Sequence, residues 1–324
     1  MGRIRGIRLT ENETPVYRDK KVGEKYLSSK KVFSRLGMGL FLMMIAIFVG
    51  QVLLSIVIGF IIPESLENSL SIILLSILTV VFFGFPVFYK VTEGIPDSEK
   101  GEVVKISFKS FIGVFLVGFA FFFISNLLGA KINTEIARLK GETDFYNPVE
   151  LIMDGKNILF TSLYVVIIGP IIEELVFRKI MLDKTRRFGE LPAIMISSIA
   201  FGLYHLNLSQ FFYAFALGLV LAYITLKTNT VFYAVILHML YNLRSTIMVP
   251  FMDNNLAIAI IVILNILAAI VGAIIFIVKS KDLKFETAKE PVEKKSAFVL
   301  NLGSILYIGL CVSTIIYYVL YGTV

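Results

Sequence analysis

The chain alternates long apolar runs with short polar interruptions, and this pattern predicts its secondary structure. A helix needs about 20 mainly apolar residues to cross a bilayer, and nine runs approach that length. They cover residues 38–62, 71–89, 110–130, 157–180, 191–208, 211–226, 231–249, 256–278 and 297–321. Backbone polar groups in lipid must be satisfied within each segment, and no run shows the period-two alternation of a barrel strand. The predicted fold is therefore an all-α, polytopic membrane helix bundle.

The distribution of Lys and Arg tests the number of spans and predicts their orientation. Cytoplasmic loops are enriched in these two residues. With the N-terminus inside and nine alternating spans, 26 of the 31 Lys and Arg residues fall on the inner side. We therefore expect nine transmembrane helices, a cytoplasmic N-terminus and an outer C-terminus. Eight spans are the alternative, because the runs at 211–226 and 231–249 are marginal.

The polar interruptions divide the chain into four parts. These are a basic cytoplasmic segment at 1–37, three spans at 38–130, a core at 155–250 and two C-terminal spans at 256–324. The core holds almost all ionisable residues of the spans. A further outer amphipathic helix is expected within 131–156, ended near Gly141, and residues 279–296 form a charged cytoplasmic connection.

The composition is typical of a membrane protein and gives no reason to expect a nucleic-acid partner. Hydrophobic residues make up 57% of the chain and charged residues 17%, whereas a soluble domain has about 25% charged residues. The net charge of +7 is explained by the basic flanks of the spans, so no nucleic-acid partner is expected. The lipid bilayer is the predicted surrounding. Cys311 is the one cysteine, so no intrachain disulfide is expected.

Ionisable residues inside the predicted spans indicate a functional site, because such residues are costly in hydrocarbon. The sequence IIEELVFR places Glu173, Glu174 and Arg178 in one span. Residues four apart share a helix face, so Glu174 is stacked for an ion pair with Arg178. Glu173 points elsewhere and has no counter-ion on its own helix. A carboxylate without a counter-ion is suited to accept and return a proton.

The two histidines of the chain lie in two further spans. In FGLYH, Phe201 and His205 share a face, so the aromatic ring shields the imidazole. In HMLYN, His238 and Asn242 lie one turn apart and offer hydrogen-bond donors of the kind that stabilise an oxyanion. Upstream of the acids, Pro170 removes a helical hydrogen bond and disturbs the helix.

These motifs carry a resemblance. The order E-E-x-x-x-R, F-x-x-x-H and H-x-x-x-N on successive membrane helices resembles the CPBP family of intramembrane endopeptidases, also called Abi, over residues 155–250. That family includes the CAAX prenyl proteases and bacterial members linked to bacteriocin self-immunity and peptide processing. The resemblance implies a multi-pass protein of a prokaryotic cytoplasmic membrane that cleaves a peptide or membrane-protein substrate.

The resemblance also implies roles for the motif residues. Glu173 is the base that activates water, and His205 is its partner on that water. His238 and Asn242 hold the oxyanion. Glu174 and Arg178 fill the remaining motif positions, with Phe201 in support.

Several alternatives stay open at this stage. Glu173, His205 and His238 are also a candidate Zn²⁺ set in a metalloprotease, although a cofactor-free site is preferred. Aspartyl chemistry is excluded because no Asp lies inside a predicted span. A non-catalytic immunity or regulatory protein is the rival from another class. The sequence leaves open the substrate, and also a membrane partner protein or a homo-oligomer.

Overall fold

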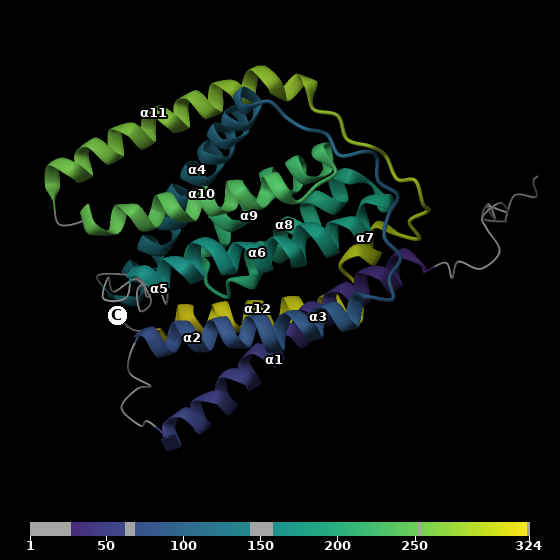
Figure 1. Ribbon diagram of the computed structural model, residues 1–324, viewed down its shortest axis with the longest axis horizontal. Coiled ribbons are helices and arrows are strands. Elements are labelled where there is room, and N and C mark those ends of the chain that lie inside the picture. Colours follow the sequence, from purple (N-terminus) through teal and green to yellow (C-terminus); the bar gives the residue numbers. More distant parts are fainter. Residues whose placement is uncertain (1–26, 62–68, 143–157, 252–253, 323–324) are drawn as a thin grey trace, which may run out of the picture.

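The computed structural model describes residues 27–61, 69–142, 158–251 and 254–322, and within these ranges the chain is helical without strands (Figure 1). The long elements are α1 (Ser29–Ile61), α2 (Ser69–Thr79) with α3 (Phe85–Thr92), α4 (Phe108–Lys140), α9 (Leu208–Thr228), α11 (Asn255–Lys279) and α12 (Leu302–Tyr321). One interrupted helix contains α5 (Ile158–Ser162), α6 (Gly169–Glu174) and α7 (Asp183–Thr185). The shorter elements are α8 (Glu190–Tyr204) and α10 (Phe232–Met248).

Each of the nine predicted runs contains one main helical stretch, although α8 ends at Tyr204 and α12 begins only at Leu302. Seven stretches of the described chain are long and apolar enough to cross a membrane. The other two are α8, with 15 residues, and α10, with 17 residues. The predicted multi-pass helical membrane fold is therefore confirmed. The prediction that 211–226 is marginal is wrong, because α9 has full length; the short helix beside it is α8.

The turn between α8 and α9 explains why α8 is short. Leu206 has a φ of 57°, in the left-handed region that an α-helix does not use. Asn207 then caps the next helix, since its side chain accepts a hydrogen bond from the N–H of Gln210 at 2.8 Å. The chain therefore reverses directly after His205, which the sequence pattern placed within a longer helix.

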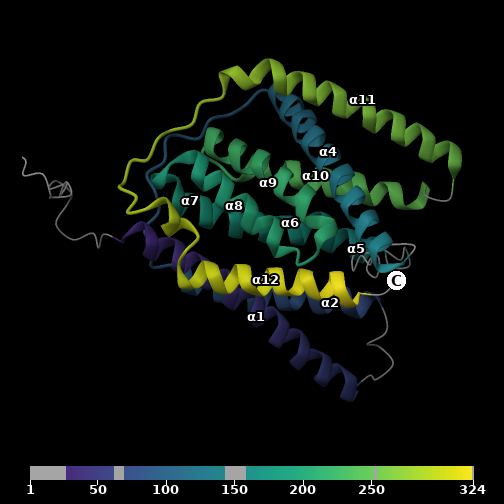
Figure 2. The same ribbon diagram turned by 180° about the vertical axis from the view of Figure 1, so that it is seen from behind.

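The helices form a central group with a layer on each side (Figures 1 and 2). α6, α8, α9 and α10 lie in the centre, where α8 packs on α9. α4 packs between α9 and α11 on one side, and α1 packs with α3 and α12 on the other. The candidate residues therefore lie on the central helices, with helices on both sides of them.

Glycine permits a very close helix crossing between α1 and α12. A Cβ atom added to Gly303 of α12 would lie 1.8 Å from the carbonyl oxygen of Ser34 in α1. Likewise, a Cβ atom at Gly37 would lie 2.4 Å from the backbone nitrogen of Ser304. Any larger side chain at Gly303 therefore has to push the α1 and α12 backbones apart.

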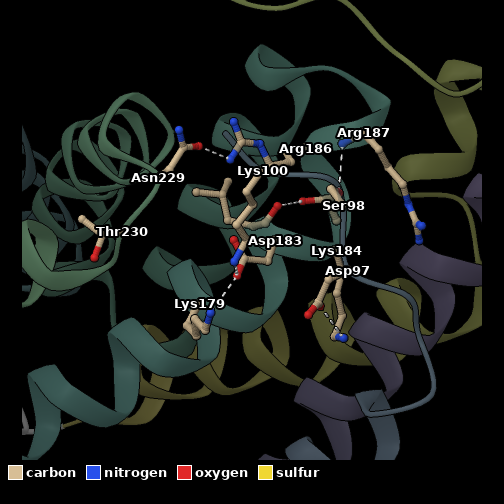
Figure 3. A network of polar contacts seen from close by, with 12 residues as sticks. Asp97, Ser98, Lys100, Lys179, Asp183, Lys184, Arg186, Arg187, Asn229 and Thr230 are labelled. Atoms are coloured by element: carbon tan, nitrogen blue, oxygen red, sulfur yellow. Dashed lines mark hydrogen bonds and ion pairs between the residues drawn. The ribbon is translucent and has the colours of Figure 1, made fainter. Parts of the chain in front are cut away.

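Polar contacts join several segments at one end of the bundle (Figure 3). Ser98 donates its N–H to the carbonyl of Asp183 at 2.8 Å, and Lys100 pairs with the Asp183 carboxylate. Lys184 lies 3.0 Å from Asp97, and Arg186 donates to the side-chain oxygen of Asn229 at 2.8 Å. The extended segment after α3 is thus tied to α7 and to the end of α9.

The connection between α11 and α12 reaches the same end. The buried carboxylate of Glu190 accepts from the ammonium of Lys227 at 2.5 Å and from the N–H of Glu286 at 2.9 Å. Lys289 donates its N–H to the carbonyl of Arg187 at 2.8 Å. The segments that the sequence assigns to the cytoplasmic side therefore share one end of the molecule.

The fourth span, Ile158–Phe188, is not a regular α-helix. Leu163–Ile168 and Leu175–Leu182 are π-helical and flank α6. In the first of them, the N–H of Gly169 bonds to the carbonyl of Tyr164, five residues earlier. π-Helical turns are frequent at functional sites, and α6 between them carries both acids of the motif.

Two helices of the described chain extend beyond the predicted spans. The outer helix expected within 131–156 is not a separate element up to residue 142, because α4 runs unbroken to Lys140. It ends as expected at Gly141, whose φ of 76° is left-handed. α1 begins at Ser29, so it includes the end of the basic segment predicted at 1–37. Residues 1–26 and 143–157 lie outside the described residues.

Candidate active site

Glu174 lies at the centre of a buried ionic cluster. Its Oε1 atom is 3.1 Å from Nη1 of Arg178 and 2.9 Å from Nδ1 of His238. The side chains of Glu174 and Arg178 are both 0% exposed, and that of His238 is 4% exposed. The i, i+4 pair is therefore formed as its spacing predicts. The sequence did not show that His238, 64 residues later, also contacts this acid.

Arg178 is held from several sides. Its Cζ atom lies 4.3 Å from the centre of the Phe201 ring, and its Nη2 donates to the carbonyl of Gly218 at 3.4 Å. A Cβ atom at Gly218 would lie 3.2 Å from the same Nη2 atom, so the glycine allows this approach. Phe201, predicted to shield His205, thus also covers the guanidinium.

Glu173 has different surroundings from its neighbour. Its side chain is 17% exposed, and Oε2 lies 3.6 Å from Nε2 of His238. No Lys or Arg of the described chain forms an ion pair with it. Water can therefore reach Glu173 more readily than it can reach Glu174. The imidazole of His238 lies between the two carboxylates and contacts each through a different ring nitrogen.

The charges of this cluster are not balanced if both acids are ionised. Glu173 and Glu174 then carry two negative charges against one positive charge on Arg178. A proton on His238 or on Glu173 restores neutrality, and an unbalanced charge is costly in a buried site. Glu174 Oε2 also has no hydrogen-bond partner among the described residues. The cluster thus contains a net charge that one proton can change and a buried carboxylate oxygen without a partner in the described chain.

His205 lies at the edge of the cluster. It ends α8, and its ring centre is 5.1 Å from that of Phe201. Phe201 also lies 5.6 Å from the ring of His238, so one aromatic ring contacts both imidazoles. The predicted shielding of His205 is therefore present. Its backbone carbonyl accepts a hydrogen bond from the side chain of Asn207 at 2.9 Å.

Asn242 lies one turn beyond His238 and contacts the interrupted helix. Its Nδ2 donates to the carbonyl of Val165 at 2.7 Å. Five residues after Val165 stands Pro170, which has no N–H to continue the π-helical pattern. Asn242 therefore supplies the donor that the proline cannot. One N–H of the amide is used in this way, and the second is free for another acceptor.

Three tyrosines that the sequence pattern did not single out lie in the neighbourhood of Glu173. Tyr164, Tyr204 and Tyr213 lie close enough for the charge of Glu173 to act on their hydroxyl groups. Tyr204 also packs against His205, with ring centres 6.0 Å apart. Of the three tyrosines, only Tyr204 lies within a motif of the sequence, since it immediately precedes His205 in FGLYH.

The Zn²⁺ alternative requires several ligand side chains to converge on one point. Among the described residues, no group of three or more His, Cys, Asp or Glu side chains is arranged to hold a metal ion. In the predicted set of Glu173, His205 and His238, both ring nitrogens of His238 face carboxylates.

Fold and site together define an integral, multi-pass helical membrane protein with a buried Glu–Arg–His cluster. Residues 155–244 match the family model described as Type II CAAX prenyl endopeptidase Rce1-like. An 86-residue stretch is 34% identical to Putative membrane peptidase YdiL of Bacillus subtilis (strain 168). The resemblance to CPBP-family peptidases is confirmed over this segment.

The comparisons cover only part of each protein. The match to the Bacillus protein spans 25% of this chain and 34% of that relative, so about a third of the relative's length is covered. No solved structure gives a significant match to this chain. The segment that matches the family model contains all the motif residues from Glu173 to Asn242.

Proposed function

We propose that this protein is an intramembrane endopeptidase that hydrolyses peptide bonds with a water molecule activated by Glu173. One observation carries the proposal: two adjacent carboxylates have opposite surroundings. Glu174 is fully buried against Arg178, whereas Glu173 is partly exposed and has no cationic side chain other than His238 paired with it in the described chain. Glu173 is therefore the acid that can exchange a proton with water.

The proposed reaction begins at Glu173. Glu173 takes a proton from water, and the resulting hydroxide attacks the carbonyl carbon of the scissile bond. The negative charge that forms on the carbonyl oxygen is stabilised by hydrogen-bond donors. Glu173 then returns the proton to the leaving nitrogen, so that one peptide and one water yield a carboxylic acid and an amine.

The other motif residues take positioning and stabilising roles in this proposal. His205 orients the water from the far side of Phe201. His238 and Asn242 are the proposed oxyanion donors, Asn242 through the N–H that Val165 does not use. Glu174 and Arg178 hold His238 in place, since Glu174 accepts from Nδ1 and leaves Nε2 facing Glu173. Phe201 packs against the guanidinium and against both imidazoles.

Two experiments test the proposal. One measures cleavage by the full chain reconstituted into lipid vesicles, and the other compares the peptides present in membranes by mass spectrometry. Membranes containing the wild-type chain are expected to accumulate cleaved peptides that are absent with Glu173→Ala. His205→Ala is expected to lose the same products. Glu135→Ala, which changes a carboxylate that is 51% exposed on α4, is the matched control and should keep them. Cleavage at the wild-type rate by the purified Glu173→Ala variant would show that another group performs the chemistry.

Two further experiments distinguish the proposal from a zinc-dependent protease and from a non-catalytic protein. A zinc enzyme would lose activity with a chelator and regain it with Zn²⁺, whereas the proposed mechanism is insensitive to both. A non-catalytic immunity or regulatory protein would keep its cellular effect in the Glu173→Gln variant. The proposed substrate is a peptide or membrane protein, with CAAX-like and bacteriocin-type peptides as the first to assay. The proposed location is the cytoplasmic membrane of a prokaryote.

A further inference from the structure

A groove runs between α4 and α10 on the side of α10 that faces away from Glu173. Its volume is about 390 Å³, which falls within the range of about 300–1,000 Å³ for ligand pockets. We call it the α4–α10 groove. Its apolar walls include Phe111, Ile112 and Phe115 of α4 and Leu240, Leu243 and Ile247 of α10.

Aromatic side chains hold the two helices apart and create this groove. The ring of Tyr241 stacks on that of Phe115 with centres 4.9 Å apart, and its hydroxyl donates to the Phe115 carbonyl at 2.6 Å. A Cβ atom at Gly118 would lie 2.3 Å from the same hydroxyl oxygen, so this glycine admits the tyrosine. The helices therefore touch through large rings, and the space beside the rings stays open.

Arg244 is the one charged residue that lines the groove within the described chain. Its guanidinium lies 4.7 Å from the centre of the Phe119 ring and is only partly exposed. No carboxylate of the described chain forms an ion pair with it, whereas Arg178 has Glu174 and Arg186 has Glu190. A guanidinium in an apolar setting is stabilised by a counter-ion, and here the protein segments described do not provide one.

The position of Arg244 along α10 indicates where the counter-ion comes from. Arg244 lies four residues before Met248, the end of the helix, which corresponds to about 6 Å of rise. A 3₁₀ turn, Val249–Phe251, follows directly. A long arginine side chain this close to the end of a membrane helix can extend its guanidinium to the level of the lipid headgroups. An Arg guanidinium binds a phosphate through two parallel hydrogen bonds.

We propose that the α4–α10 groove binds one anionic glycerophospholipid, with an acyl chain against the apolar walls and the phosphate on Arg244. The apolar lining accounts for the acyl chain. The guanidinium, which has no carboxylate partner among the described residues, accounts for the preference for a negatively charged headgroup. The proposal does not depend on the peptidase activity, because the groove lies on the other side of α10 from the acids.

The experiment is native mass spectrometry of the purified full chain with phosphatidylglycerol and phosphatidylcholine that carry identical acyl chains. The wild-type chain is expected to retain one phosphatidylglycerol in preference to phosphatidylcholine by about fivefold, the effect of one basic residue near an anionic lipid. Arg244→Gln should lose this preference. Arg138→Gln removes a guanidinium that is 71% exposed on α4, and it should keep the preference.

A second variant tests the apolar part of the groove. Leu243→Trp fills the groove next to Arg244 and should lower lipid retention while the arginine stays in place. Ile263→Trp, at a position 57% exposed on α11, is the matched control and should retain the lipid.

Four outcomes would overturn the proposal. The first is an equal preference for phosphatidylglycerol in the wild type and in Arg244→Gln, and the second is unchanged lipid retention in Leu243→Trp. The third is displacement of the bound lipid by soluble glycerol phosphate as effectively as by added phosphatidylglycerol. The fourth is that Arg244→Gln loses a bound second copy of the chain and not a bound lipid.

Discussion

Glu173 and Glu174 are neighbours in sequence but differ in what surrounds their carboxylates. The Glu174 carboxylate is buried and contacts both Arg178 and His238, so it holds these two side chains in place. Glu173 is one residue earlier and therefore about 100° around the helix, where it meets His238 Nε2 and a partly exposed region. Replacing each acid by its amide is expected to affect different properties of the protein.

Glu173→Gln is expected to lower the rate of peptide cleavage by about 10²–10⁴-fold, the usual contribution of a general base. The amide keeps the shape of the side chain but cannot take a proton. The thermal midpoint in detergent should stay at the wild-type value, because Glu173 has no guanidinium or ammonium partner in the described chain. Cleavage assays and thermal unfolding of the same preparation measure the two effects, with Glu135→Gln as the control.

Glu174→Gln is expected to destabilise the protein by about 3–5 kcal/mol, because it leaves the buried charge of Arg178 without its carboxylate. Unfolding in denaturant, followed in detergent micelles, measures this loss. The double variant Glu174→Gln with Arg178→Met removes both charges and should recover much of the stability. A single variant as stable as the wild type would show that the buried pair does not hold the cluster together.

At the scale of the helical elements, the side chain of Asn242 supplies a hydrogen-bond donor that Pro170 lacks. Pro170 cannot donate to Val165, and Asn242 of α10 donates instead. This contact joins the helix with the acids to the helix with His238, so it also sets the distance between them. The π-helical turns on either side of α6 show that this helix does not follow the regular α pattern that its sequence suggests.

Asn242→Ala is expected to cost about 1–3 kcal/mol of stability, because the partly buried Val165 carbonyl loses its donor. In a Pro170→Ala background the cost should be smaller, since an alanine at that position restores an N–H to the backbone. A double-mutant cycle of unfolding free energies measures this coupling. Additive effects of the two substitutions would mean that Asn242 does not substitute for the missing N–H.

The crossing of α1 and α12 allows a second comparison at this scale. Gly303→Ala is expected to destabilise by about 1–3 kcal/mol through overpacking, since a Cβ atom there meets the backbone of Ser34. Gly309→Ala lies on the same helix with nothing within 4 Å of the added Cβ atom. It should stabilise α12 by about 0.5–1 kcal/mol. Thermal unfolding of the two variants side by side measures the difference in sign.

For the molecule as a whole, the positively charged segments meet at one end. Ion pairs and hydrogen bonds join the segment after α3 to the α7 turn and to the end of α9 (Figure 3). The connection before α12 is joined to the same end through Glu190 and Arg187. The charge bias predicts that this end faces the cytoplasm, because basic loops are retained on that side.

Cysteine labelling tests this orientation. In a Cys311→Ala background, Glu286→Cys should react with a membrane-impermeant maleimide only after the membrane is opened. Glu135→Cys, in the outer part of α4, should react in intact cells. Both positions are more than half exposed, so access through the membrane and not burial decides the result. The reverse labelling pattern would invert the predicted topology.

Much of the fold followed from local patterns. All nine predicted helices, the end of α4 at Gly141 and the Glu174–Arg178 pair depend on residues near one another in sequence. The short α8 did not follow, because its end is set by the left-handed backbone at Leu206. The tyrosines around Glu173 were missed as well, since apolar spacing does not show which aromatic residues face a carboxylate.

The sequence by itself determined the membrane-spanning helices, the separation of the two acids by helix geometry and the set of rare polar residues within the spans. These depend on hydropathy and on helical periodicity, which act over one or two turns. Only the tertiary structure decided that His238 lies between both carboxylates, that Phe201 covers Arg178 and that Asn242 replaces the N–H absent from Pro170. Those contacts join residues 23 to 77 positions apart, and their geometry depends on how whole helices pack.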